Sequence, residues 1–338
     1  MMRIVVVGAG IAGLATAHAL AAVGLRCVVL EQADAPREDG FGIQIASAGA
    51  RRLPQWGLSL DSFAVQPVAR ELRRWRDGAL IARVPLAAPY YATRRSDLSR
   101  VLRAGVPVRY GAQCVGISET GAVLLSDGSC RPADLVIGAD GLRSVVRGAL
   151  SSDSVRRAGA SAWRAVVRVD EVRWWSGSPR VIVWLGPGQH CVCYPIAPGL
   201  LNVVAVGSSF DDWHADVRAL LDAARSPVRH DLFDRAPLAR RVSGRIALVG
   251  DAAQPMLPYL AQGASQGIED ASALAACLAS ETDVPAALAR YDAVRGPRAA
   301  AVAEAVRVAA REHHLPDGPE QRVRDRRLAA AARGGAER

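Results

Sequence analysis

Apolar residues at the start of the chain follow the order of a strand, a helix and a second strand. Residues 3–7 form an apolar, β-branched run, and a helical pattern covers residues 14–23 until Gly24 ends it. A second apolar run at residues 27–30 is closed by Glu31. This order predicts a βαβ unit with parallel strands.

Short strands are predicted for the middle of the chain. Two of them flank the turn at Asp77-Gly78 within residues 68–86, and a short helix is expected at residues 97–102. Further strands are predicted at residues 106–110, 114–118, 123–125 and 135–137. Four runs separated by Gly/Pro turns indicate an antiparallel layer at residues 163–169, 181–185, 191–194 and 202–206.

Helical patterns dominate the last third of the chain. After one more buried strand at residues 246–249, helices are expected at residues 265–278 and 286–311. Residues from Pro316 onward are rich in Arg, Ala and Gly, and we expect them to fray.

Composition limits the class of protein. Half of the residues are apolar, which is enough for a sizeable core, and no run of about 18 uncharged apolar residues could span a membrane. All 42 basic residues are Arg and the net charge is +9, but no basic run is interleaved with aromatic residues, which argues against nucleic-acid binding. The six cysteines include no CxxC pair, which argues against a metal or disulfide framework. Since the chain also begins without a signal peptide, we expect a cytoplasmic protein.

A glycine motif stands between the first predicted strand and the first predicted helix. Gly8, Gly10 and Gly13 have the GxGxxG spacing, and Glu31 follows Gly13 by eighteen residues at the end of the second strand. In this context the glycines allow a tight turn, the approach of a pyrophosphate and close helix packing, while the acid accepts hydrogen bonds from a ribose. The N-terminus of the helix offers free N–H groups to the phosphates.

Two further glycine turns follow predicted strands. Residues 250–251 are Gly-Asp, and a Gly-rich segment at residues 262–267 then opens a helix whose N-terminus would stabilise an anion such as a reduced flavin. Residues 138–141 are Gly-Ala-Asp-Gly, a turn that taken alone is more often structural than functional.

The three motifs, in this chain order, resemble those of the group A flavoprotein monooxygenases, the family of salicylate hydroxylase and para-hydroxybenzoate hydroxylase. They match the family's adenine-dinucleotide motif, its DG motif (residues 138–141) and its GD motif (residues 250–251). Residues 40–45 and 94–98 resemble two more family segments, the second of which contacts the flavin. The resemblance extends through the central sheet and the C-terminal helix to about residue 311.

The resemblance implies the fold class and the division of the chain. The fold is expected to be α/β, a Rossmann-type FAD-binding domain with an interleaved β-rich substrate layer and C-terminal helices. The FAD-binding part is assigned to residues 1–66, 96–155 and 241–285, the substrate layer to residues 67–95 and 156–240, and a C-terminal helix and tail to residues 286–338.

The resemblance also implies the residues that bind FAD. They are Gly8, Gly10, Ile11, Ala12, Gly13, Glu31, Gln32, Arg37, Arg95, Cys114, Asp140, Asp251, Gly263 and Ala264.

The activity implied by the family is the hydroxylation of a small, aromatic or polyketide-like substrate. NADPH or NADH reduces FAD and then leaves. The chain has a single GxGxxG motif, so NAD(P)H has no Rossmann domain of its own and is expected to bind transiently. The reduced flavin and dioxygen form a C4a-hydroperoxide, whose distal oxygen is transferred. The cofactor carries this chemistry, so the protein has to hold the flavin, exclude water and position the substrate, without a metal.

Four residues are candidates for the substrate side of the flavin. Pro258 and Tyr259 match the family's proline-containing loop, and His190 and Tyr194 lie in the central sheet. The ordinary pKa of histidine suits His190 as a general base. The alternative for His190 and both tyrosines is a core or surface position without a catalytic role.

The chain departs from the family in two respects. Gln254 stands where the family usually has His, and segments near Leu102 and within residues 202–234 are short. The absence of lysine argues strongly against a flavin-dependent halogenase, which depends on one near the substrate. A flavoprotein oxidase or dehydrogenase, or a non-catalytic FAD-binding protein, remains as an alternative.

The expected partners are a small-molecule substrate and dioxygen. Neither nucleic acid nor a membrane is expected as a partner, and the protein is expected to be a monomer or a homodimer.

Overall fold

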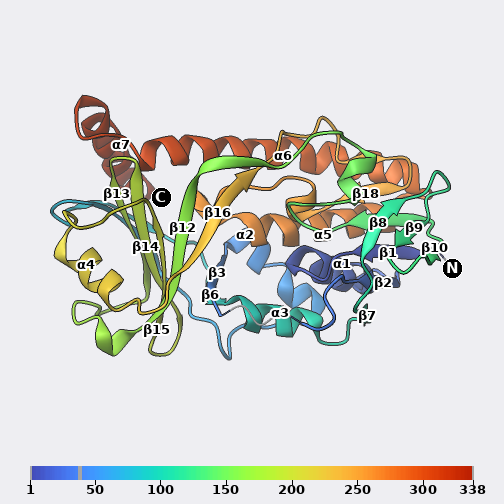
Figure 1. The fold of residues 1–338 in the computed structure, drawn as a ribbon, viewed down its shortest axis with the longest axis horizontal. Helices are drawn as coiled ribbons and strands as arrows, with labels where there is room; N and C mark the ends of the chain where they lie inside the picture. The colour runs from blue at the N-terminus through green and yellow to red at the C-terminus, as the bar shows by residue number, and fades with distance from the viewer. Residues whose placement is uncertain (1, 37–39, 337–338) are drawn as a thin grey trace.

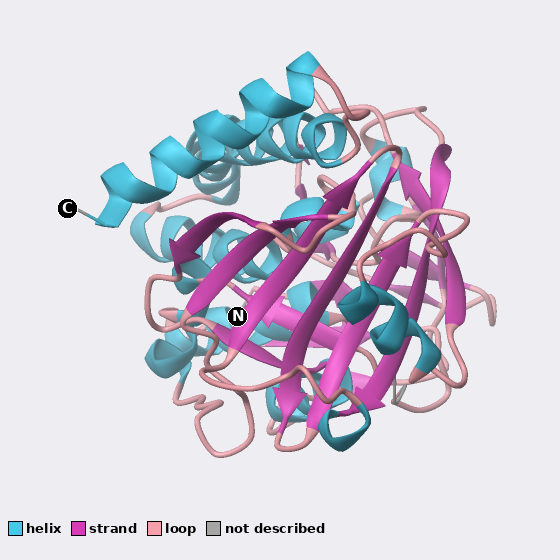
Figure 2. Cartoon of the chain, turned by 90° about the vertical axis from the view of Figure 1, so that its left-hand side faces the viewer, coloured by secondary structure: helices cyan, strands magenta, loops and turns pink. Residues whose placement is uncertain are grey.

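The computed structural model describes residues 2–36 and 40–336. A six-stranded sheet and a seven-stranded sheet lie at opposite ends of the elongated molecule, and the long helix α6 (Val284–His313) runs above both (Figure 1). Figure 2 shows the seven-stranded sheet face-on, from the side that lies at the left in Figure 1. Both expected elements of the fold, a parallel α/β part and an antiparallel layer, are therefore present.

The six-stranded sheet contains the predicted βαβ unit. Its strands, in spatial order, are β17 (Val242–Ser243), β18 (Ile246–Leu248), β11 (Leu135–Gly138), β1 (Ile4–Val7), β2 (Cys27–Leu30) and β7 (Val108–Arg109). All neighbours pair in parallel except β17, which pairs antiparallel at the edge. Every residue of β1 is buried because both faces of the sheet are covered.

Two helices cover one face of this sheet. The small residues of α1 (Ile11–Ala22) pack against α5 (Gly263–Ser280), and both helices begin just beyond the carboxyl ends of strands. On the other face lies a three-stranded sheet of β8 (Cys114–Ile117), β9 (Val123–Leu125) and β10 (Cys130–Arg131). Ligands of open parallel sheets bind at this carboxyl edge.

The seven-stranded sheet takes its strands from two distant stretches of the chain. Its spatial order is β16 (Val228–Asp234), β12 (Arg156–Arg168), β15 (Leu200–Val206), β14 (Gln189–Ala197), β13 (Arg180–Gly186), β4 (Ala69–Arg74) and β5 (Leu80–Pro85). Only β13 and β4 are parallel. On the outer face of this sheet, Trp184 packs against α4 (Ala215–Asp222). On the inner face, Val204 and Val206 pack against Leu257, in the loop that precedes α5.

Smaller elements connect the two large sheets. The two-stranded sheet of β3 (Gly42–Ile45) and β6 (Tyr91–Arg94) lies between them. In the chain, the short helix α2 (Ser47–Ala50) follows β3, and α3 (Arg95–Arg103) follows β6. β6 pairs with β3 and also contacts β14 of the seven-stranded sheet, so the assignment of residues 67–95 to the substrate layer stays a prediction. The other boundaries of the proposed parts stay a prediction.

The expectation of a fraying tail is wrong. Residues Pro319–Ala336 form α7, which lies along β5. Leu328 and Ala332, four residues apart and so on one face of the helix, pack onto the apolar cluster of the sheet. Among the described residues, no helix is long and apolar enough to cross a membrane.

Candidate cofactor and substrate site

The glycine turn between β1 and α1 leaves open space at its centre. Gly8 has a φ of +103°, and a Cβ there would lie 2.5 Å from the carbonyl oxygen of Ala139. A Cβ on Gly13 would overlap the carbonyl oxygen of Gly8, whereas a Cβ on Gly10 would meet nothing within 4 Å. Gly8 and Gly13 thus permit the turn, and Gly10 faces free space where a phosphate group can approach.

Glu31 is held at the end of β2 by the same turn. Its carboxylate accepts hydrogen bonds from the backbone N–H groups of Ala9 at 2.8 Å and Ala33 at 2.9 Å. Carboxylate oxygens accept more than one hydrogen bond each, so both can still accept from the hydroxyls of a ribose.

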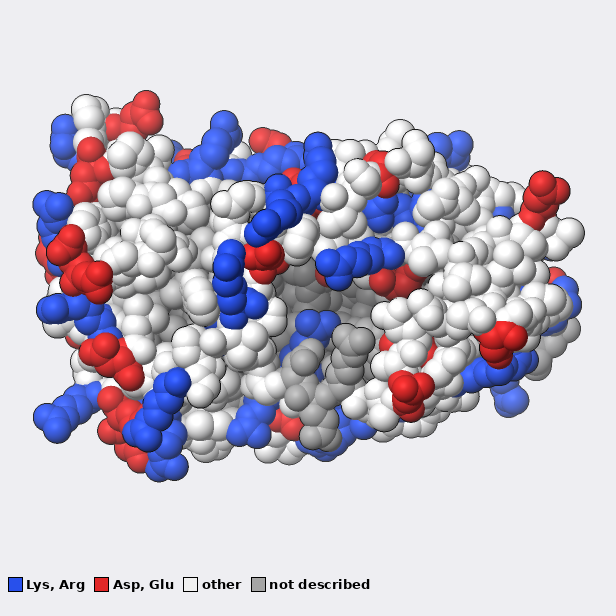
Figure 3. All heavy atoms as spheres, in the orientation of Figure 1, with Lys and Arg blue, Asp and Glu red and all other residues white. Residues whose placement is uncertain are grey.

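A cavity of about 470 Å³ extends from this turn along the carboxyl edge of the sheet. Seven of the expected FAD-binding residues line it: Gly8, Gly10, Glu31, Gln32, Arg95, Cys114 and Asp140. Three arginines, Arg95, Arg103 and Arg143, add positive charge to its wall. In the space-filling view, a hollow near the middle of the molecule is surrounded by basic side chains (Figure 3).

The other expected residues lie outside this wall. Ile11, Gly13 and Ala264 are buried and Ala12 is half-buried. Asp251 lies in the short turn Gly250–Ala252, and Gly263 is the first residue of α5. Arg37 falls outside the described residues. The direct contact expected of these residues with FAD stays a prediction.

The Gly250-Asp251 turn is fixed by buried charges. Gly250 has a φ of +59°, and a Cβ there would lie 2.7 Å from the Cβ of Ala12 on α1. Its backbone N–H donates to the carboxylate of Asp270 at 2.9 Å. Asp270 is paired in turn with Arg295 at 2.7 Å and Arg241 at 3.2 Å. This network holds the turn against α1 and α5, and no sequence motif predicts it.

Asp251 stands at the open side of this turn. The residue is accessible to solvent, yet enough protein surrounds its carboxyl to raise the pKa by desolvation. The positive charge of Arg95 opposes this rise and Asp270 adds to it. Since Arg95 also lines the cavity, it links Asp251 electrostatically to the dinucleotide cleft.

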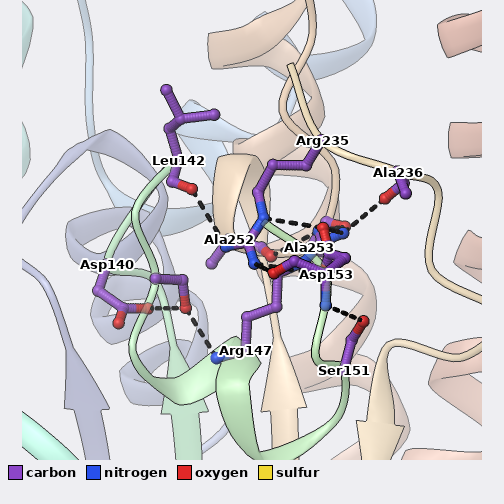
Figure 4. Close-up of polar contacts among 10 residues, drawn as sticks. Asp140, Leu142, Arg147, Ser151, Asp153, Arg235, Ala236, Ala252 and Ala253 are labelled. Atoms are coloured by element: carbon purple, nitrogen blue, oxygen red, sulfur yellow. Dashed lines mark hydrogen bonds and ion pairs between the residues drawn. The ribbon is translucent and has the colours of Figure 1, made fainter. Parts of the chain in front are cut away.

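The Gly138–Gly141 turn lines the cavity and is fixed by hydrogen bonds to Asp140. Asp140 accepts hydrogen bonds from the Ser144 hydroxyl and the backbone N–H of Val145, at 2.6 and 2.7 Å, and burial raises the pKa of its carboxyl. Arg147, fully buried, donates to the carbonyl oxygens of Ala252 and Ala253 at 3.2 and 2.9 Å (Figure 4). The DG and GD segments are therefore tied together through Arg147.

The residues present suit an anionic dinucleotide such as FAD. Neither α1 nor α5 has a side chain that caps its N-terminus, so first-turn N–H groups of both helices stay available for an anion. The open space at Gly10, the fixed carboxylate of Glu31 and the arginines of the cavity complete this set. Among the described residues, no group of three potential ligands could hold a metal ion.

Three histidines and a tyrosine meet at the inner face of the seven-stranded sheet. His190 of β14 is buried, and its ring lies 5.1 Å from that of Tyr259, 5.6 Å from His313 and 5.1 Å from His314, between centroids. Tyr259 belongs to the turn Pro258–Leu260, which leads from Asp251 to α5. The structure therefore brings His190 and Tyr259 together, as their shared assignment to the substrate side requires.

Tyr194 lies on the same face as His190 but in a different environment. Burial raises the pKa of its hydroxyl, and hydrogen bonding with Gln44 works against this rise. Gln44 also accepts a hydrogen bond of 2.7 Å from the Tyr90 hydroxyl. Tyr194 thus joins a buried polar network between β14 and β3.

Known proteins resemble this chain over nearly its whole length. A family model described as "FAD binding domain" matches residues 127–306, and one described as "FAD dependent oxidoreductase" matches residues 3–84. The 3-amino-4-hydroxybenzoate 2-monooxygenase of Streptomyces cremeus is 42% identical, covering 97% of this chain and 92% of that protein. The chain belongs to the family of FAD-dependent aromatic monooxygenases.

Two further relatives agree with this assignment. The 3-hydroxybenzoate 6-hydroxylase 1 of Aquipseudomonas alcaligenes is 34% identical over 89% of this chain and 86% of that protein. The structure of Klebsiella pneumoniae HpxO complexed with FAD and uric acid is 25% identical and superposes with a TM-score of 0.89, covering 99% and 96% of the two chains. The predicted family, fold class and FAD cofactor are confirmed.

The monooxygenase is shorter than its relatives in some segments. The alignment with the Streptomyces cremeus protein runs over 362 positions, more than the 338 residues of this chain, and therefore contains gaps in it. These gaps agree with the prediction that the chain lacks segments of its relatives. The predicted positions of the missing segments, near Leu102 and within residues 202–234, stay a prediction.

Several residues of the site were not predicted. Arg147, Asp270 and Arg295 hold the two turns, and His313 and His314 adjoin His190. The adjacent histidines were a usable signal, since they closely follow the long predicted helix at residues 286–311 and the chain has only six histidines. The network of Asp270 gives no such signal, because its partners are 20 or more residues away.

Proposed function

We propose that this monooxygenase hydroxylates a small aromatic acid that carries a phenolic hydroxyl. The relatives at 42% and 34% identity are named for aminohydroxybenzoate and hydroxybenzoate substrates. The observation that carries the proposal is a pair of side chains on one face of the seven-stranded sheet, the cation Arg164 and the imidazole of His190.

The strand register supports a shared face for these two residues. Arg164 of β12 lies opposite Val204 of β15, which lies opposite Val192 of β14. Two residues along each strand, the next such row across the three strands consists of Ala162, Val206 and His190. Directly paired residues point to the same side of a sheet, as do residues two apart in one strand. Arg164 and His190 therefore point to the same side, separated by the small apolar surface of Val192 and Val204.

Arg164 has the properties of an anion-binding group. The residue is half-buried, and desolvation lowers the pKa of its guanidinium. Among the described residues it forms no ion pair or side-chain hydrogen bond, and its electrostatic neighbours are Tyr194 and the cation Arg95. A partly desolvated cation is stabilised by a partner charge, and the carboxylate of a benzoate supplies one.

His190 is suited to accept the proton of the substrate hydroxyl. Its pKa is lowered, chiefly by burial, so the ring is neutral at physiological pH and can act as a base. Its Nε2 forms no hydrogen bond with the described residues. Removal of the proton makes the aromatic ring more electron-rich, which favours attack by an electrophilic oxygen.

FAD, when bound, supplies the reduction of dioxygen and the transfer of one oxygen atom, with NADPH or NADH as the source of electrons. We assign Gly10, Glu31, Arg95 and Asp251 to holding it, and Pro258 and Tyr259 to closing the site beside it. Replacing Tyr259 would admit water, so NAD(P)H oxidation would continue with more peroxide and less product. A cytoplasmic location and a monomeric or dimeric state stay predictions.

Paired substrates test the proposal. We expect 3-amino-4-hydroxybenzoate, but not its decarboxylated analogue 2-aminophenol, to stimulate NAD(P)H oxidation at low concentration. In Arg164→Gln the KM for the acid should rise by roughly one to two decades, the value of a charge-assisted hydrogen bond. Arg168→Gln, an exposed arginine of the same strand, is the control. Equal use of both compounds by the unaltered enzyme would refute the proposed substrate class.

A further inference from the structure

The C-terminal end of α6 joins the substrate side of the site through a pair of histidines. Nδ1 of His190 lies 2.8 Å from Nε2 of His314, so one ring donates a hydrogen bond to the other. His190 is buried, whereas His314 is half-buried and reaches solvent. Two imidazoles in this arrangement connect an enclosed point to the surface.

We infer that His314 is a proton-relay residue, which takes up the proton that His190 receives from the substrate hydroxyl and passes it to water. The inference rests on the proposed function, because it needs a substrate whose hydroxyl is ionised at His190. It assigns a role to the end of α6, which lies about 120 residues after His190 in the chain.

The transfer is balanced in three steps. The O–H bond of the substrate breaks and an N–H bond forms at Nε2 of His190. The N–H bond at Nδ1 of His190 breaks and one forms at Nε2 of His314. Nδ1 of His314 then releases its proton to water, which leaves both rings neutral and the substrate as a phenolate.

The environment of the three histidines favours transfer of the proton to water over its retention on an imidazole. Burial is the main cause that lowers the pKa of His190, His313 and His314, so none of them keeps a positive charge at neutral pH. The other groups that face the cluster are the neutral Tyr259 and the cations Arg70 of β4 and Arg324 of α7. No carboxylate among the described residues is paired with His190 or His314, so a proton held there would lack a counter-charge.

The backbone of His314, rather than its side chain, holds the neighbouring hairpin. The carbonyl oxygen of His314 accepts a 2.9 Å hydrogen bond from the N–H of Gly188, in the turn between β13 and β14. A substitution of the side chain preserves this bond. The imidazole can therefore be replaced without removing the contact that docks α6 on the sheet.

A chromophoric ligand tests the relay without turnover. 4-Hydroxy-3-nitrobenzoate is a benzoate whose phenolate absorbs visible light, and its ionisation on mixing with FAD-loaded enzyme can be followed by stopped flow. In His314→Gln, whose amide keeps a hydrogen bond to Nδ1 but takes up no proton, we expect ionisation at least about tenfold slower. FAD content and the equilibrium Kd of the ligand should stay within about twofold, since only the rate of proton transfer is affected.

Two further variants separate a relay from a structural effect. His313→Gln is the matched control, because His313 adjoins the pair but forms no hydrogen bond with His190 among the described residues. It should ionise the ligand at the rate of the unaltered enzyme. His314→Ala should be slow and should be accelerated by imidazole added to the solvent.

The outcomes distinguish the inference from the proposed function. An unchanged rate in His314→Gln, an equal loss in His313→Gln, or no effect of imidazole on His314→Ala would overturn the relay alone. An unaltered enzyme that does not bind the ligand would overturn the proposed aromatic acid, and the relay with it.

Discussion

The guanidinium of Arg147 donates to both carboxylate oxygens of Asp153, at 2.9 and 3.0 Å. The same guanidinium reaches the carbonyl oxygens of Ala252 and Ala253 behind the Gly250-Asp251 turn, while Arg235 provides a second cation for Asp153 (Figure 4). This cluster joins two segments that are about 100 residues apart in the chain. The shape of the flavin site thus depends on an ion pair that does not line it.

We predict that Arg147→Gln destabilises the enzyme by about 3–5 kcal/mol, because it removes the fully buried guanidinium that holds Asp153 and the carbonyl oxygens of Ala252 and Ala253. Urea unfolding, followed by circular dichroism, measures this change. Arg157→Gln, which breaks an exposed pair with Asp231, should cost less than about 1 kcal/mol. Similar losses in both variants would contradict the special position of Arg147.

The same ion pair predicts a dependence of stability on pH. Burial would raise the pKa of Asp153, but hydrogen bonds from Arg147 and Arg235 outweigh it, and the net pKa in the folded state lies below the usual range. A carboxyl with a depressed pKa stabilises the fold above its unfolded value of about 3.9, and this contribution is lost as the pH falls below that value. The difference in unfolding free energy between the unaltered enzyme and Asp153→Asn should therefore shrink from pH 7 to pH 3. A constant difference would rule this explanation out.

Gly10→Val should prevent FAD binding without unfolding the protein. A side chain at Gly10 meets no protein atom within 4 Å and instead fills the space left for the pyrophosphate. Gly148→Val is the control, since Gly148 is exposed and also has free space around it. The flavin absorbance per chain of the purified proteins decides the matter. Full occupancy in Gly10→Val, with a normal melting temperature, would mean that the pyrophosphate binds elsewhere.

Asp251→Ala should weaken FAD binding by roughly one to two decades in Kd, since a charge-assisted hydrogen bond to the ribityl chain contributes about 1.5–3 kcal/mol. Titration of the apoprotein with FAD, followed by flavin fluorescence, measures the loss. Asp211→Ala, in an exposed loop, should leave the Kd unchanged. An equal Kd for Asp251→Ala and the unaltered protein would show that Asp251 does not contact the cofactor.

The local parts of the fold could be predicted from the sequence, since they depend on short-range patterns. The strand at residues 27–30 and that at residues 123–125 coincide with β2 and β9, and Gly8, Gly10 and Glu31 meet at one cavity because a βαβ unit brings them together. The glycine spacing, read together with the flanking strand and helix and with Glu31, is sufficient for this part of the site.

Long-range contacts could not be predicted in the same way. The polar strand β16 lacks the apolar alternation of a strand and is fixed by pairing with β12. The partners of Asp270 and of Arg147 come from distant segments, and α7 is ordered by packing on β5 rather than by its composition. His314 meets His190 only because α6 spans both sheets, so their pairing depends on the tertiary fold.

The central claim is that oxygen from dioxygen enters the substrate. The most direct test supplies ¹⁸O₂, NAD(P)H and the best aromatic acid to the FAD-loaded enzyme and measures label in the product beside a peroxide assay. The account predicts one labelled oxygen atom per product molecule, with peroxide well below the NAD(P)H consumed. Product without label, together with peroxide equal to the NAD(P)H consumed, would show that the enzyme is an oxidase or dehydrogenase and would contradict the account.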